Sequence, residues 1–264
     1  MHSTDVFQHY ERNHWRLSDI DFSAVRKDLV RPEYVTIARS ALMGEATIVA
    51  GVHGFLNEFV DDYDFSNFAL VWGYQEVQHH IAFRTWLRAL DADADVEDAP
   101  VEATRQPYAP GITPSATLAT NIISELIVNH VYKSLARYVE EPVLRDLMLR
   151  ASLDEAAHAR EFIHYTRARL ARLPDELPSV LETLYVYTAD SRIRHPVGLF
   201  KSGLAELAGH ETIDTAFDLF LEQVADAGEL EELHTKIRKT FSGLTDLDLS
   251  SNSRVRRALA EQLV

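Results

Sequence analysis

SLDEAAHAREF, residues 152–162, is the stretch on which the predicted fold rests. Its Glu155 and His158 stand three positions apart on what the sequence predicts to be a long helix. Both side chains therefore leave the same face of that helix, about one turn apart. A carboxylate and an imidazole held in this way can bind one metal ion. The same pair occurs earlier in the chain, as Glu76 and His79 within YQEVQHH, residues 74–80.

A single glutamate inside an apolar helix precedes each of these pairs. Glu45 lies within ALMGEATIV, residues 41–49, and Glu125 lies within NIISELIV, residues 121–128. Burying an ionised carboxylate without a partner costs several kcal/mol. Each of these two glutamates must therefore either face solvent or meet a cation.

Helical patterns surround these residues, and no β-alternation of useful length is visible. Residues up to 30 are expected to form an irregular arm or short helices, and the acid- and proline-rich residues 91–114 a long connection of the kind seen in ferritin-like bundles. Four main helices are predicted over residues 32–60, 65–90, 115–140 and 142–172, with further helices near 179–192, 197–208, 213–227 and 229–241 and a basic tail helix. The predicted fold is all-α: one ferritin-like domain over residues 1–264, with a four-helix bundle core at about 32–172 and additional C-terminal helices at about 179–264.

Composition narrows the class of protein. The chain has 264 residues, of which 46% are hydrophobic, enough for a substantial core. Its formal net charge of −15 argues against a general nucleic-acid binder. Because there is no cysteine, disulfides, iron–sulfur clusters and thiolate zinc sites are excluded. Neither a signal peptide nor a membrane span is expected, so a cytoplasmic protein is predicted.

Four carboxylates and two imidazoles on four helices form the ligand set of ferritin-like di-iron and di-manganese proteins. Two divalent ions bring about four positive charges, which four carboxylates balance in a dry interior. One imidazole per metal leaves coordination positions open for dioxygen. The alternative is a metal-free bundle in which both pairs arose by chance. The predicted metal ligands, which are also the predicted catalytic residues through the metal centre, are Glu45, Glu76, His79, Glu125, Glu155 and His158.

With these residues in place, the chain resembles the acyl-acyl carrier protein desaturases, soluble di-iron enzymes of the ferritin-like superfamily. The resemblance covers roughly residues 32–208. It rests on Glu45, on QEVQH at 75–79, on Glu125 and on DEAAH at 154–158, with the His195-Pro196 segment after the core. Two departures are Gln75, where the family often has Glu, and Val128, one turn after Glu125, where desaturases tend to carry Thr.

The resemblance implies two iron ions, dioxygen as co-substrate and external electrons from a ferredoxin. It also implies a homodimer and a fatty acyl chain on acyl carrier protein, into which a cis double bond is inserted. Asp154 would orient His79 from outside the ligand set, and Gln75 would do the same for His158. Acyl carrier protein is acidic, so docking on this acidic chain would need a local basic patch.

Three hypotheses remain open at the level of sequence. The first is a di-iron oxidase acting on an acyl chain, most simply a desaturase. The second is a di-iron hydroxylase or N-oxygenase of a specialised pathway with a smaller substrate. The third is a non-enzymatic ferritin-like iron-binding protein. A long, narrow apolar tunnel beside the metal site would favour the first hypothesis, and a short polar pocket the second.

Overall fold

The computed structural model describes residues 1–90, 97–99, 110–189 and 227–262. These residues form helices and no strand, which confirms the predicted all-α class for this part of the chain. Their contacts divide them into two compact units. Described residues 1–90, 97–99 and 132–151 belong to the first unit, and residues 110–131, 152–189 and 227–262 to the second. The predicted single ferritin-like domain stays a prediction.

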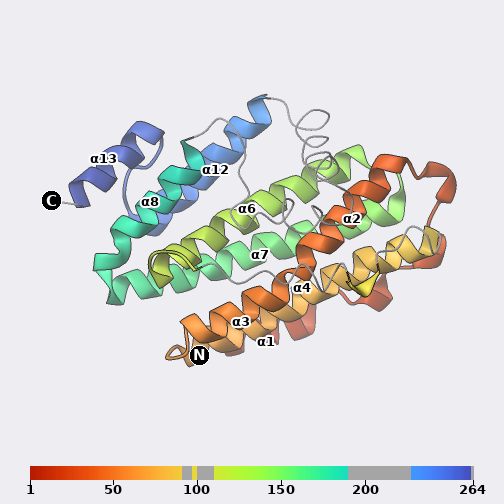
Figure 1. The fold of residues 1–264 in the computed structure, drawn as a ribbon, viewed down its shortest axis with the longest axis horizontal. Helices are drawn as coiled ribbons and strands as arrows, with labels where there is room; N and C mark the ends of the chain where they lie inside the picture. Colours follow the sequence, from red (N-terminus) through yellow and green to blue (C-terminus); the bar gives the residue numbers. More distant parts are fainter. Residues whose placement is uncertain (91–96, 100–109, 190–226, 263–264) are drawn as a thin grey trace. The chain divides into compact units, whose positions relative to one another are not determined.

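The first unit is built on a helical hairpin (Figure 1). α2 (Pro32–Ala46) and α3 (Ile48–Glu58) run in one direction, and α4 (Tyr63–Leu90) returns along them in contact with both. Gly73 allows the close approach of α3 and α4, because a Cβ atom built on it would lie 2.5 Å from Val52 Cγ2. The buried rings of Phe55, Phe65 and Trp72 fill the space between these helices, with Phe55 5.4 Å from Phe65 and 5.2 Å from Trp72.

The helix predicted over residues 32–60 is interrupted at Thr47. The backbone N–H and the hydroxyl of Thr47 both donate to the Gly44 carbonyl, at 3.1 and 2.8 Å. The Thr47 N–H thus donates to the carbonyl three residues earlier, whereas in a regular α-helix it would donate to the carbonyl four residues earlier. The single predicted helix is therefore wrong in detail, since it forms α2 and α3.

The N-terminal segment forms short helices, one of the two predicted alternatives, and begins with α1 (His2–Asn13), a helix of 12 residues. α1 packs along α4, and the Asp64 carboxylate of α4 takes the place of a helix cap. It accepts hydrogen bonds from the N–H of His2 at 3.2 Å and from the N–H and hydroxyl of Ser3 at 3.1 and 2.6 Å. Short 3-10 turns at Leu17–Asp19, Phe22–Ala24 and Lys27–Leu29 lead from α1 to α2.

Two long helices contribute residues to both units. α6 (Pro114–Tyr138) and α7 (Pro142–Arg172) closely match the predicted helices at 115–140 and 142–172. Glu141 precedes α7 and is fully buried. Its carboxylate accepts hydrogen bonds from the N–H of Leu144 at 2.8 Å and of Arg26 at 3.1 Å, and from the Trp86 indole at 2.8 Å. Glu141 thus caps α7 and joins three segments of the first unit.

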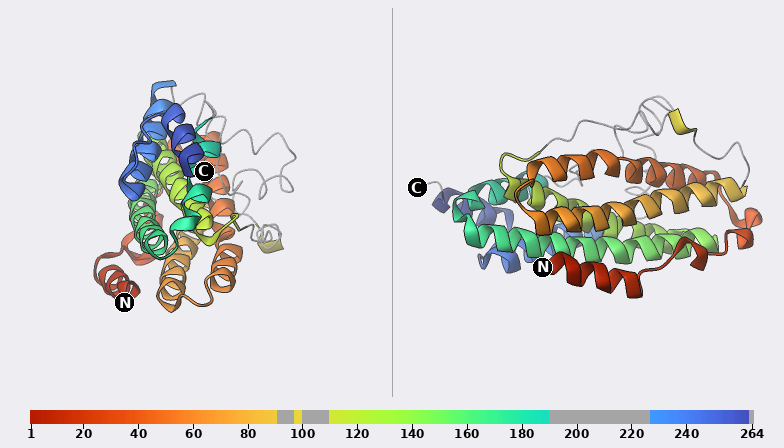
Figure 2. Two further views of the ribbon diagram at one scale, coloured as in Figure 1. Left: turned by 90° about the vertical axis from the view of Figure 1, so that its left-hand side faces the viewer. Right: turned by 90° about the horizontal axis from the view of Figure 1, so that it is seen from below.

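The second unit includes α8 (Leu177–Thr188), α12 (Ala227–Thr245) and α13 (Asn252–Gln262). α8 contacts both α12 and α13, and the views in Figures 1 and 2 agree in placing the three helices side by side. These helices confirm those predicted near 179–192 and 229–241 and in the tail. The helices predicted at 197–208 and 213–227 lie outside the described residues, except for residue 227, and so do His195 and Pro196.

Glu176 links the end of α7 to the start of α6 within the second unit. It forms two hydrogen bonds of 2.8 Å with the Arg169 guanidinium and accepts a third, of 3.1 Å, from the Ser115 N–H. The bond from Arg169 is the main reason that the pKa of Glu176 lies below its ordinary value of 4.5. The charge of Arg169 is therefore largely balanced by Glu176.

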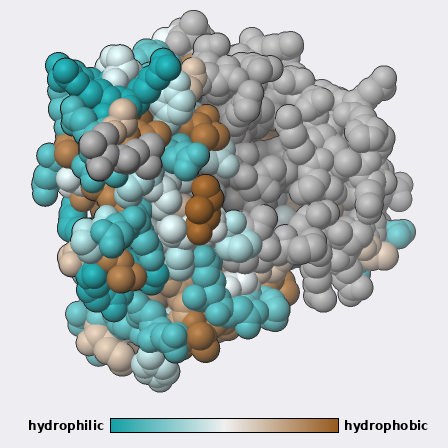
Figure 3. Space-filling model, turned by 60° about the vertical axis from the view of Figure 1, so that its left-hand side comes forward, coloured by the Kyte–Doolittle hydropathy of each residue, from teal (hydrophilic) through white to brown (hydrophobic). Residues whose placement is uncertain are grey.

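The coloured part of the surface in Figure 3 is mostly hydrophilic, with small separate hydrophobic patches. Among the described residues, the stretch Pro32–Glu58 is long and apolar enough to cross a membrane, judged by length and composition alone. In its most apolar window, 56% of the residues are buried, and Leu42 and Phe55 are core side chains of the first unit. The absence of a membrane span stays a prediction.

Candidate metal centre

The first unit brings Glu45 of α2 together with Glu76 and His79 of α4. One ligand atom from each of these three side chains lies within 4.8 Å of the others. His79 Nδ1 is 3.2 Å from Glu76 Oε2 and 3.9 Å from Glu45 Oε2. Since residues three apart on a helix share a face, Glu76 and His79 converge as the sequence predicts. We call Glu45, Glu76 and His79 the first triad.

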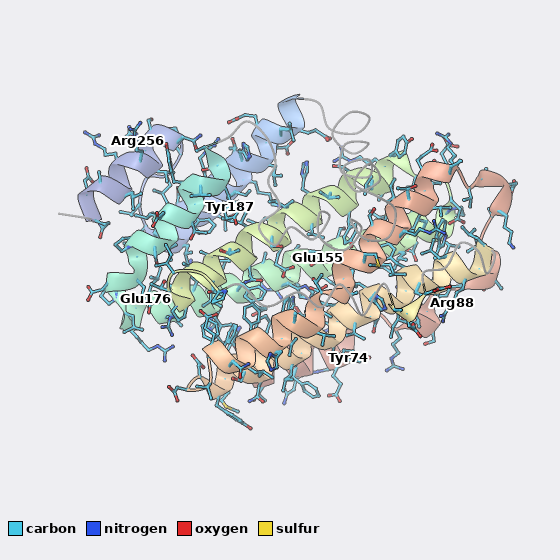
Figure 4. The ribbon with its side chains drawn as sticks, viewed as in Figure 1. Tyr74, Arg88, Glu155, Glu176, Tyr187 and Arg256 are labelled. Atoms are coloured by element: carbon cyan, nitrogen blue, oxygen red, sulfur yellow. The ribbon has the colours of Figure 1, made fainter. Side chains whose placement is uncertain are left out.

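The second unit repeats this arrangement with Glu125 of α6 and Glu155 and His158 of α7. These three residues also offer ligand atoms within 4.8 Å of one another. His158 Nδ1 is 3.2 Å from Glu155 Oε2 and 3.5 Å from Glu125 Oε2. Figure 4 labels Glu155 on α7. We call Glu125, Glu155 and His158 the second triad.

Both triads are withdrawn from solvent. The exposed fraction is 0% for both histidines, 5% for Glu76 and Glu125 and 2% for Glu155. The Glu45 side chain is 10% exposed. Two carboxylates so close together in a dry environment repel each other when both are ionised, and a cation between them removes that repulsion. Each triad is therefore a buried group that could hold a metal ion.

The distances within each triad fit a shared ion. Two ligands bonded to one metal ion at about 2.1 Å, roughly at right angles, lie about 3 Å apart. The distances from histidine Nδ1 to the nearest glutamate oxygens, 3.2 to 3.9 Å, are close to that value. Two carboxylates and one imidazole suit iron, manganese and zinc, and the absence of cysteine excludes a thiolate site. The donor set is compatible with iron but does not select it.

Tyr132 is a residue of the first unit's site that the sequence analysis did not identify. Its hydroxyl donates a hydrogen bond to Glu45 Oε1, and its ring packs against Phe83 at a centroid distance of 5.6 Å. The hydroxyl therefore holds one oxygen of the first-triad carboxylate while the other faces His79. Tyr132 lies two turns after Glu125 on the same helix. This spacing puts both residues on a similar face, and it was the one sign in the sequence that Tyr132 could lie near the site.

Trp15 is the second residue that the sequence analysis missed as part of the site. Its indole stacks on the His79 imidazole, with ring centroids 6.1 Å apart and an angle of 7° between the planes. The Gln78 side-chain amide donates to the Trp15 carbonyl at 2.9 Å, and the Arg150 guanidinium lies 5.9 Å from the indole. The N-terminal segment thus covers one face of the His79 ring of the first triad.

A polar chain lies one turn beyond Glu125 in the second unit. Asn129 is 8% exposed, donates to the Ser152 carbonyl at 2.5 Å and accepts from Lys236 Nζ at 2.7 Å. Lys236 belongs to α12, so this accessory helix supplies a cation next to the helix turn that carries the second triad. Val128, the departure from the desaturase pattern, is 7% exposed.

The structure also describes the residues predicted to support the ligands. Asp154 and Gln75 are 7% and 1% exposed. Their predicted partners, His79 for Asp154 and His158 for Gln75, belong to the other unit in each case, so these two roles stay predictions. Of the other histidines on the core helices, His53 and His164 are exposed and His80 contacts the Leu42 carbonyl at 3.0 Å.

Comparisons of the chain with protein-family models, with curated proteins and with solved structures gave no match.

Proposed function

We propose that the protein is a dioxygen-dependent oxidase in which both triads together hold two iron ions within a ferritin-like four-helix bundle. The observation that carries this proposal is the repetition of one ligand geometry. In both triads the histidine Nδ1 is 3.2 Å from the glutamate of its own Glu-x-x-His pair, and a second glutamate comes from another helix earlier in the chain. A buried carboxylate group of this kind has an evident use only with a cation.

The chain's own residues prepare the site for such ions. Four glutamates supply the negative charge, and burial keeps bulk water from competing for the metal ions. Tyr132 fixes the Glu45 carboxylate, and Trp15 restricts the His79 ring. When bound, two ferrous ions supply the electrons and open coordination positions that dioxygen activation requires.

The substrate that we propose is a fatty acyl chain on acyl carrier protein, desaturated to a cis alkene with ferredoxin as electron donor. This part rests on the resemblance of the ligand motifs to those of acyl carrier protein desaturases, as does the proposed homodimer. The product would have the mass of the substrate less two hydrogens.

A hydroxylase or N-oxygenase acting on a smaller substrate is the second candidate. The observations that favour it are Val128 in place of the expected threonine and the chain from Lys236 through Asn129 to Ser152 beside the second triad. A cation and an amide at that place suit a polar substrate better than an alkyl chain. A non-enzymatic iron-binding protein ranks third.

Iron stoichiometry tests the proposed centre. The wild-type chain, loaded anaerobically with ferrous iron and desalted, is expected to retain two irons per chain. His158→Ala and Glu125→Ala are expected to lose tight binding of both. His164→Ala and Glu182→Ala are the matched controls, since His164 and Glu182 are exposed helical residues outside the triads. Two irons retained in His158→Ala would contradict the assignment.

Product mass separates the two enzymatic candidates. Iron-loaded protein is incubated with ferredoxin, its reductase, dioxygen and stearoyl- or palmitoyl-acyl carrier protein. Loss of two hydrogens from the acyl chain supports desaturation, and gain of one oxygen supports hydroxylation. Iron binding with neither product and no dioxygen uptake beyond that of ferrous iron in buffer would favour the non-enzymatic reading.

A further inference from the structure

A cavity between the N-terminal segment and α4 lies outside the candidate metal centre but shares a wall with it. Its volume is about 410 Å³, within the range of roughly 300–1,000 Å³ that ligand pockets occupy. Rings and aliphatic side chains form most of the wall, contributed by Phe7, Tyr10, His14, Trp15, Leu70 and Tyr74. All of them belong to the first unit.

The cavity presents apolar side chains that a soluble protein normally covers. The exposed fractions of Phe7, Leu70 and Tyr74 are 52%, 53% and 66%. Tyr74, labelled in Figure 4, projects from α4 away from the buried face of that helix. Exposed apolar groups gathered around a hollow are typical of a binding site rather than of a solvated helix face.

The rings of the wall continue inward as a stack. Tyr10 meets His14 edge to face at 5.9 Å, and His14 stacks on Trp15 at 5.6 Å with 28° between the planes. Trp15 in turn stacks on His79 of the first triad. A ligand in the cavity would therefore touch rings that lead directly to a proposed metal ligand.

The lining indicates the chemical class of the ligand. Five rings favour a planar aromatic molecule, because such molecules stack on tryptophan, tyrosine and histidine. Arg16 adds a permanent cation to the lining, which suits a phosphate group, and Glu11 offers an acceptor for a ring N–H. We propose that the cavity binds a flavin mononucleotide and that this flavin, reduced in turn by the proposed ferredoxin, is the immediate electron donor to the metal ions.

This inference rests on the proposed function only for the role of the ligand. A reduced flavin gives up two electrons and two protons and becomes oxidised flavin, with one electron for each ferric ion held by the triads. The protons go to solvent, to which the cavity is open. The binding site itself requires no metal ion.

Tryptophan fluorescence of the metal-free protein, titrated with oxidised flavin mononucleotide, tests the site. Saturable quenching is expected in the wild type, and its amplitude should fall strongly in Trp15→Phe, because Trp72 and Trp86 are buried elsewhere. Leu70→Gln should raise the Kd at least about tenfold. Ile81→Gln is the matched control, an equally neutral change at an exposed position of α4 outside the cavity, and should bind as the wild type does.

The donor role has its own readout. Iron-loaded protein is first oxidised to the ferric state and freed of dioxygen. Anaerobic mixing with reduced flavin mononucleotide should then bleach the ferric absorbance, and Leu70→Gln should slow this bleaching in proportion to its weaker binding. Absence of saturable quenching in the wild type, or equal affinity in Leu70→Gln, would overturn the site. Equal bleaching rates would overturn the donor role. Failure of the chain to bind iron would remove the proposed function but leave the fluorescence result standing.

Discussion

Replacing Glu155 by glutamine should have opposite effects on stability with and without iron. Glu155 and Glu125 offer oxygens within 4.8 Å of each other, and both residues are buried. At an effective dielectric constant of about 20, two unit charges at that separation repel by about 3.5 kcal/mol. Glutamine has almost the shape of glutamate but no charge, so it removes this repulsion from the metal-free protein.

The net gain is smaller than the full repulsion, because the His158 imidazole next to both carboxylates already offsets part of it. We expect metal-free Glu155→Gln to be more stable than the wild type by about 1–2 kcal/mol, which corresponds to a Tm about 2–8 °C higher. In the wild type, ferrous iron at about a hundred times its Kd should add roughly 2.7 kcal/mol. Glu155→Gln should lose most of that addition.

The assay is thermal unfolding under anaerobic conditions, with chelator or with ferrous iron, followed by circular dichroism. Glu182→Gln, an exposed change on α8, is the control and should behave as the wild type in both conditions. The reasoning would be refuted if Glu155→Gln lowered the Tm of the metal-free protein, or if iron raised the Tm of both proteins equally. Either result would make Glu155 an ordinary structural carboxylate.

Two further predictions concern carboxylates outside the triads. Glu141→Ala should destabilise the protein by about 4 kcal/mol, because it leaves the buried Trp86 indole and the first turn of α7 without their hydrogen-bond acceptor. The number of irons bound per chain should stay unchanged. Denaturant unfolding checks the stability and metal analysis checks the iron, and a loss of iron would show that Glu141 serves the metal site. The bonds from Arg169 lower the pKa of Glu176, so the stability contributed by this carboxylate is present above its unfolded-state pKa near 4.5 and is lost as the pH falls through the lower folded-state value. Glu176→Gln should therefore lower the Tm by a few degrees at pH 7 but have little effect well below pH 4, and an equal loss at both pH values would contradict the role of its charge.

The helices and the two Glu-x-x-His pairs could be predicted from the sequence because they depend on residues close together in the chain. The spacing of Glu76 with His79, and of Glu155 with His158, fixes their common face wherever the helix lies. Proline at the heads of α2 and α7 marked their first residues well, because proline is tolerated in the first turn of a helix but not further in. By contrast, the break at Thr47 depends on hydrogen bonds that a threonine inside an apolar helix makes in some proteins and not in others. The sequence therefore did not predict this break.

What the sequence by itself determined is therefore the all-α class and the common face of each Glu-x-x-His pair, since both follow from helical periodicity. Only the tertiary structure decided which other residues join and surround these pairs. Tyr132 reaches Glu45 across 87 positions, and Trp15 reaches His79 across 64. Contacts between residues so distant depend on how helices pack rather than on local spacing, because the chain between them can place the same side chains on many different neighbours.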